Sequence, residues 1–94
     1  MAFFSHTQIE TSEGSRIVKR LCNHWKHKFD IAEVEGKFHI PFPEAEVTLY
    51  PTEHYIFIEI KTADSDVLEK YQNVVIDHLN RMAQQEFSVD WQSK

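Results

Sequence analysis

Three side chains that could bind a metal ion lie close together in the sequence: Cys22, His24 and His27. Thiolate and imidazole are the ligand types that zinc, copper or iron select. On a helix, Cys22 would point about 160° away from His24 and about 140° away from His27, so no single ion could bind Cys22 together with either histidine. His24 and His27 would lie about 60° apart on neighbouring turns and could share an ion.

A third imidazole, His78, could complete such a site from a second predicted helix. It lies among apolar residues of that helix, and a histidine in this setting is more often a core residue with one hydrogen bond than a ligand. Cys22 could equally be a small apolar residue buried in the core. We therefore expect no metal and no cofactor, and we keep a metal site formed by His24, His27 and His78 as the alternative.

A basic ridge follows one side of the first predicted helix, with Arg16, Arg20, Asn23 and His27 spaced at i, i+4, i+7 and i+11. Because it lies opposite the apolar side of this helix, it should face solvent. It could dock an acidic protein or a small anionic ligand, or it could be a plain solvated surface. The candidate binding residues are Arg16, Arg20, His24, His27, Lys28, His78 and Arg81.

The charge of the chain is unevenly distributed. Residues 12–29 carry five bases against one acid, whereas the remainder carries five bases against fourteen acids, for a net charge of −5. Nonspecific binding to nucleic acid needs a dominant positive field, so we expect no nucleic-acid partner. The local positive segment is compatible with a smaller anionic partner.

Length and composition indicate a single domain covering residues 1–94. One cysteine, Cys22, excludes an internal disulfide and fits a reducing compartment. The first residues lack the basic and apolar regions of a signal peptide, and no apolar run approaches the roughly 20 residues that span a bilayer. We therefore expect a soluble cytoplasmic protein with no membrane partner.

Catalytic signatures are missing from the sequence. There is no G-x-S-x-G elbow, P-loop or G-x-G-x-x-G run, and only Gly14 and Gly36 are available to build a phosphate-binding loop. Function must be argued from a site, and no set of catalytic residues assembles. The sequence therefore favours a noncatalytic accessory or protein-interaction domain over an enzyme.

Two helices are predicted from apolar residues at helical spacing. Residues 15–29 place theirs within one arc of about 140°, and Thr11 or Ser12 could supply the N-cap. Residues 65–85 form the second helix, which Asp64 or Ser65 could cap. The apolar positions are Ile17, Val18, Leu21, Cys22, Trp25 and Phe29 in the first helix, and Val67, Leu68, Tyr71, Val74, Val75, Leu79 and Met82 in the second.

Between the helices the apolar period becomes two, which indicates strands. The alternating apolar positions are Ala32, Val34, Phe38, Ile40, Val47, Leu49, Ile56, Ile58 and Ile60. Glu35 and Gly36 form a predicted turn, residues 7–11 a weak first strand, and Phe87, Val89 and Trp91 a short final strand. The predicted fold is α+β, in the order β-α-β-β-β(-β)-α-β, with both helices on one face of an antiparallel sheet.

The run from Leu21 to Phe29, the segment His78-Leu79-Asn80-Arg81 and the C-terminal Trp91 together resemble the bacterial domain-of-unknown-function family 2218. The resemblance covers nearly the whole chain. It implies a TATA-binding-protein-like fold, similar to the C-terminal domain of phosphohexomutases. It implies no established activity, and its one functional hint is an association with siderophore and iron-uptake genes.

The sheet face left open by the helices is the predicted interface. If Ile56, Ile58 and Ile60 point inward, alternation sends Tyr55 and Phe57 outward, beside Tyr50 of the neighbouring strand. Exposed aromatic clusters are commonly interaction surfaces. We therefore expect Tyr50, Tyr55 and Phe57 to contact a partner, with a two-fold homodimer as the default. The competing explanation is that the C-terminal tail, including Trp91, covers this face.

Overall fold

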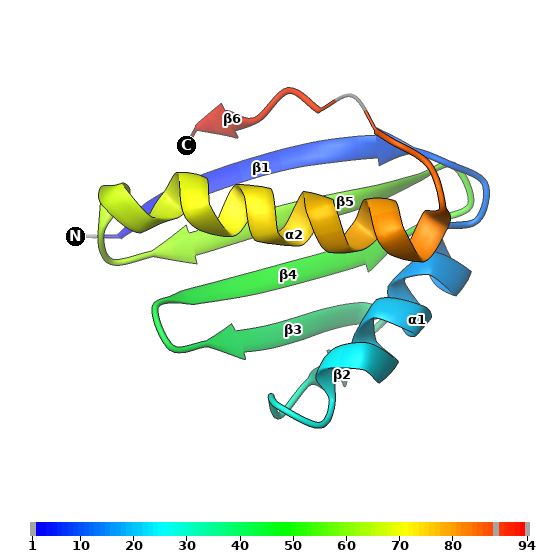
Figure 1. Ribbon diagram of the computed structural model, residues 1–94, viewed down its shortest axis with the longest axis horizontal. Helices are drawn as coiled ribbons and strands as arrows, with labels where there is room; N and C mark the ends of the chain where they lie inside the picture. The colour runs from blue at the N-terminus through cyan, green and yellow to red at the C-terminus, as the bar shows by residue number, and fades with distance from the viewer. Residues whose placement is uncertain (1, 88, 94) are drawn as a thin grey trace.

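The computed structural model describes residues 2–87 and 89–93. In that part of the chain, two α-helices lie on one face of a six-stranded antiparallel sheet, as predicted (Figure 1). The strand order in the sheet is β2-β3-β4-β5-β1-β6. The elements are β1 (Phe3–Glu10), α1 (Gly14–Trp25), β2 (Ala32–Val34), β3 (Lys37–Phe42), β4 (Ala45–Pro51), β5 (Tyr55–Thr62), the 3₁₀ turn η1 (Ser65–Val67), α2 (Leu68–Ala83) and β6 (Gln92–Ser93).

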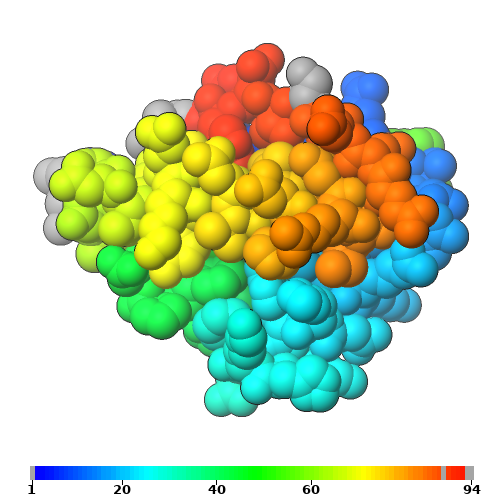
Figure 2. Space-filling model, viewed as in Figure 1, coloured from blue at the N-terminus to red at the C-terminus, as the bar shows by residue number. Residues whose placement is uncertain are grey.

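The core lies between the sheet and the two helices, and the atoms of α2, yellow to orange in Figure 2, cover the middle of this side of the molecule. Ile58, at the centre of β5, pairs with Leu49 of β4 and Thr7 of β1 and is 0% exposed. The inward alternation of β5 is therefore confirmed. Every residue predicted to form the common core is buried, namely Ile17, Leu21, Trp25, Val47, Leu49, Ile56, Ile58, Ile60, Val75 and Leu79.

Helix α1 is shorter than predicted, because it ends at Trp25 instead of Phe29. The chain turns there, with the Phe29 amide donating to the Trp25 carbonyl at 3.0 Å. This turn brings the Phe29 ring to 4.7 Å from the ring of Phe42 on β3, a contact that a continued helix would carry away from the sheet. At the other end Glu13 is the N-cap, and the Thr11 hydroxyl accepts from the Glu13 amide at 3.1 Å instead of capping the helix itself.

Helix α2 is preceded by the 3₁₀ turn η1, so its α-helical part begins at Leu68 and not at Ser65. The predicted cap by Asp64 is confirmed, since its carboxylate accepts from the Asp66 amide at 2.9 Å. The helix ends at Ala83, where Gln84 adopts a left-handed conformation with φ of 58°.

The predicted turn at Glu35 and Gly36 is confirmed, with φ of 52° and 82°. Positive φ at both central residues matches a type I′ hairpin, whose twist suits two antiparallel strands. With this two-residue loop Val34 pairs with Lys37, so Val34 stands on the open face and is 54% exposed. Strand β2 therefore adds an exposed edge to the sheet and nothing to the core.

The two ends of the chain differ from the sequence prediction. The first strand covers Phe3–Glu10, and the final strand is only Gln92–Ser93, so Phe87, Val89 and Trp91 precede it. These three side chains are half-buried against the core cluster. Figure 1 shows the tail returning from the end of α2 to run beside β1. These residues do not form a strand, and their side chains instead pack against one side of the core.

Candidate functional site

The sheet face opposite the helices carries an aromatic patch, defined as Tyr50, Tyr55 and Phe57. Tyr50 of β4 lies directly across from Phe57 of β5, and Tyr55 precedes Phe57 by two residues on the same strand. All three side chains are half-buried. The Lys37 ammonium lies 5.7 Å from the centre of the Tyr50 ring, and the His6 ring lies 5.8 Å from that of Phe57.

A shallow hollow of about 430 Å³ lies over this patch. Its lining combines the three aromatic rings with polar side chains from β3, β4 and β5, which are Lys37, Thr48 and Glu59. A second hollow of about 370 Å³ adjoins it and is also lined by Phe57, together with His6, Gln8 and Gln92. Phe57 therefore lies between two hollows on the open face.

Sequence reasoning missed Lys37 and His6 as neighbours of the patch. Both depend on strand order: β1 inserts next to β5, which places His6 opposite Glu59, and β3 lies beside β4. The alternation of each strand gave the outward residues, but no local signal states which strands are neighbours.

The described part of the C-terminal tail lies at the edge of the sheet beside β1. The Thr7 hydroxyl donates to the Asp90 carbonyl at 2.9 Å, and Gln92 pairs with His6. The Trp91 side chain packs against the core cluster, and none of the described tail residues lines the hollow over Tyr50 and Tyr55. The tail therefore borders the aromatic patch only on the Phe57 side, where Asp90 and Gln92 line the adjoining hollow, and its described residues leave the hollow over Tyr50 and Tyr55 open.

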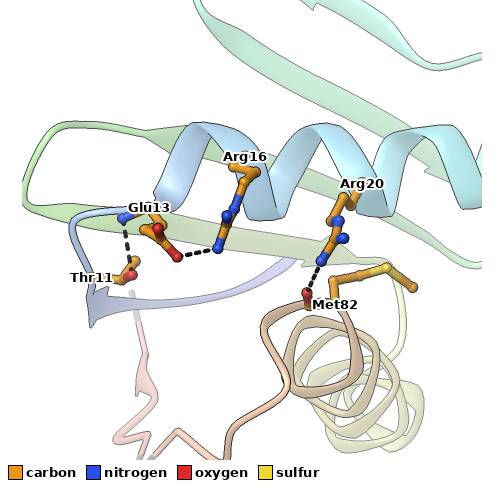
Figure 3. A network of polar contacts seen from close by, with 5 residues as sticks. All are labelled: Thr11, Glu13, Arg16, Arg20 and Met82. Carbon is orange, nitrogen blue, oxygen red and sulfur yellow. Dashed lines mark hydrogen bonds and ion pairs between the residues drawn. The ribbon is translucent and has the colours of Figure 1, made fainter.

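The basic ridge on α1 faces solvent, and both of its arginines have local partners (Figure 3). Arg16 forms an ion pair with Glu13. Arg20 donates to the Met82 carbonyl at 3.2 Å, so it contacts the last turn of α2. His27 and Lys28 are also exposed, in the turn that follows the helix. Docking of an acidic partner to this ridge stays a prediction.

Helices α1 and α2 bring His24 and His78 together, with ring centres 5.7 Å apart. His78 also lies 4.9 Å from the Trp25 ring, and its Nδ1 lies 2.7 Å from the Val74 carbonyl oxygen. A carbonyl can only accept, so Nδ1 carries the proton and donates. The predicted single hydrogen bond of a core-edge histidine is therefore present.

A site with three protein ligands does not assemble in the described part of the chain. Among residues 2–87 and 89–93, no group of three or more histidine, cysteine, aspartate or glutamate side chains could hold a metal ion. The structure thus gives the set of His24, His27 and His78 no geometric support. Arg81, on the last turn of α2, is exposed.

Cys22 is half-buried at the edge of the core. Burial raises the pKa of its thiol from 9.0 to about 11, and the negative charge of Glu33 adds to this effect. Thiolate is the nucleophilic and metal-binding form, so this environment disfavours either role. Across the same described residues, neither helix has the length and apolarity needed to cross a membrane.

Comparison with known proteins gives the same family as the resemblance seen in the sequence. Residues 6–92 match the family described as "Uncharacterized protein conserved in bacteria (DUF2218)". The chain belongs to this family. The search of curated proteins found no match.

A solved structure also aligns with this DUF2218 chain. It is the NMR structure of PA4090 from Pseudomonas aeruginosa, with a TM-score of 0.82 and 35% sequence identity, covering 96% of this chain and 95% of that one. This similarity confirms the α+β fold. The narrower TATA-binding-protein-like description stays a prediction, as does any link to iron uptake.

Proposed function

We propose that this DUF2218 chain is a noncatalytic protein-interaction domain that self-associates through the open face of its sheet. The partner surface is the aromatic patch of a second copy, related by a two-fold axis. The free thiol of Cys22 supports a reducing, cytoplasmic setting.

The aromatic patch around the hollow on the open face carries this proposal. Aromatic side chains contribute most of the binding energy at many interfaces, usually when they fill well-packed pockets near the centre. Here the rings lie on β4 and β5, which are central strands of the sheet. They are only half-buried within one chain, so a partner that covers them would remove further apolar surface from water.

The charges around the patch support a second copy as the partner. The open face carries bases and acids side by side: Glu46 lies across from Lys61, and Lys37 and Glu59 line the same hollow. In a two-fold interface each residue meets a different residue of the identical surface, so a face of mixed sign can oppose bases to acids. A face of a single sign would repel its copy.

Sedimentation equilibrium of the wild-type chain tests the proposal, from about 1 µM to about 1 mM, a range over which a moderate-affinity dimer dissociates. Phe57→Glu should weaken association by at least about 30-fold, because truncating a central interface aromatic commonly costs 2 kcal/mol or more. A wild-type chain that stays monomeric throughout this range would refute self-association.

Two further variants separate the interface from the fold. Phe3→Glu makes the same chemical change at a side chain that is 37% exposed and lies outside the patch, so it should leave association unchanged. Lys37→Glu changes an exposed rim residue without touching the core and should still weaken association. If Phe57→Glu fails to fold, Lys37→Glu alone decides the question. Dimerisation of Lys37→Glu with the wild-type affinity would then reject the open sheet face as the interface.

A further inference from the structure

The contact between α1 and α2 brings two histidines together. Arg20 reaches the carbonyl of Met82, and one turn further along α1 His24 faces His78, with ring centres 5.7 Å apart. The two helices cross at this contact (Figure 3), and 54 positions of sequence separate imidazoles that are neighbours in space. His24 is exposed and His78 is half-buried, so the pair lies where solvent reaches it.

The hydrogen bond of His78 fixes which of its nitrogens is free. Nδ1 donates to the Val74 carbonyl, so in the neutral ring the lone pair lies on Nε2. A backbone carbonyl that accepts from one ring nitrogen is the usual support of a metal-bound histidine, because it sets the tautomer and the ring orientation. His78 has no other hydrogen bond among the described residues.

The spacing of the two rings suits a shared ion. A metal–nitrogen bond of about 2.0–2.1 Å places each ring centre roughly 3.2 Å from the metal. Two rings at a tetrahedral or trigonal angle are then roughly 5.2 to 5.5 Å apart. The separation of 5.7 Å between the ring centres of His24 and His78 is slightly larger, so a shared ion would draw the two rings together by a few tenths of an ångström.

We propose that His24 and His78 form a two-histidine site for a divalent transition-metal ion, whose remaining ligands are water. Imidazole favours zinc, nickel and copper, and the general affinity order puts Cu²⁺ first. His27 is not part of this site. The proposal is independent of self-association, because the pair lies on the helix side of the molecule and the aromatic patch lies on the opposite face of the sheet.

The charges near the pair give this site a distinctive salt dependence. Arg20 lies one turn before His24 on α1, and Arg81 lies about one turn after His78 on α2, whereas Asp77 directly precedes His78. Nearby bases repel a cation, and added salt screens this repulsion. Metal affinity at the pair should therefore rise with ionic strength. Adventitious binding to the acidic remainder of the surface should instead weaken.

The test is calorimetric titration of the tag-free chain with Cu²⁺, Ni²⁺ and Zn²⁺ separately, at about pH 7.5, where an ordinary imidazole is mostly neutral. We expect one ion per chain. His24→Gln should weaken binding at least about tenfold, since even indirect partners of a metal ligand contribute about 10–100-fold. His27→Gln is the matched control, an exposed histidine three residues away, and should bind as the wild type does.

Three outcomes would each overturn the site. The first is unchanged metal binding in His24→Gln, and the second is an equal loss of binding in His27→Gln. The third is a metal affinity that decreases as salt is raised from about 0.01 M to about 1 M, over which the Debye length drops from about 30 Å to about 3 Å. His24 is exposed, so its substitution should leave the fold intact, and circular dichroism checks this. Unchanged sedimentation of His24→Gln would keep this test separate from that of the proposed function.

Discussion

The most direct test of the fold is replacement of Ile58 by alanine. This side chain is 0% exposed and lies on the central strand β5, with β4 and β1 as neighbours and the helices above. Truncation removes three carbons from a region enclosed on all sides. Buried isoleucine-to-alanine changes cost about 2–5 kcal/mol, and the larger values occur where the surroundings cannot collapse into the cavity. Because Ile58 is held between paired strands, we expect about 4 kcal/mol.

That loss is large for a chain of 94 residues. The unfolding entropy of about 2.1 cal/mol/K per residue gives roughly 0.2 kcal/mol/K for this length, so a 4 kcal/mol loss lowers the Tm by about 20 °C. Urea unfolding followed by tryptophan fluorescence measures the free energy, with the thermal midpoint as an independent check. The graded change Ile58→Val should cost about 0.5–1.5 kcal/mol.

Val34→Ala is the matched control, because this side chain also lies on a strand but is 54% exposed. Its cost should stay within about 0.5 kcal/mol, the usual range for surface positions. An Ile58→Ala cost below about 1.5 kcal/mol, or one no larger than that of Val34→Ala, would contradict the strand register. The assignment of Tyr55 and Phe57 to the open face would then be wrong as well.

Three other predictions concern Cys22 and Gly14. The thiol of native Cys22 has a pKa of about 11 instead of 9.0, so near pH 8 far less of it is thiolate than in the unfolded chain. It should therefore react with iodoacetamide about 100-fold more slowly in the native protein than in denaturant. Equal rates would contradict the burial of Cys22. Because this pKa is raised in the folded state, stability should also fall as the pH rises from 9 through 11, in urea titrations across that range. Gly14→Ala would place a Cβ 3.0 Å from Ile56 Cγ1 and 3.3 Å from the Thr52 carbonyl oxygen. This overpacking should lower the free energy of unfolding by about 1–3 kcal/mol. Ser15→Ala, at an exposed neighbouring position, is the control and should leave it unchanged.

Local patterns were enough to predict the layers of this fold. The helical spacing of Ile17, Leu21 and Trp25 and the alternation of Ile56 to Ile60 each require one buried side, and two helices on one sheet face is the packing that satisfies both. The turn at Glu35 and Gly36 was equally local, since a glycine between two alternating runs marks a hairpin turn with positive φ. These features depend on residues close together in the sequence.

Features that depend on distant parts of the chain were missed. The end of α1 at Trp25 follows from contacts of Phe29 with Phe42, which lies on another element. The position of β1 between β5 and β6 depends on pairing across most of the chain. For the same reason, Lys37 and His6 were not predicted beside the aromatic patch.

Core packing explains some residues of the segments that resemble the family and leaves His24 unexplained. The Trp25 ring packs edge-on against Phe29 and Phe42, at 6.4 and 5.1 Å, and lies 4.9 Å from His78. These contacts join α1, β3 and α2, so the fold alone accounts for the aromatic residues and for His78. His24 is different, because it is exposed and, among the described residues, the one aromatic ring beside it is that of His78. Core packing places no demand on an imidazole at this position, whereas a two-histidine metal site does.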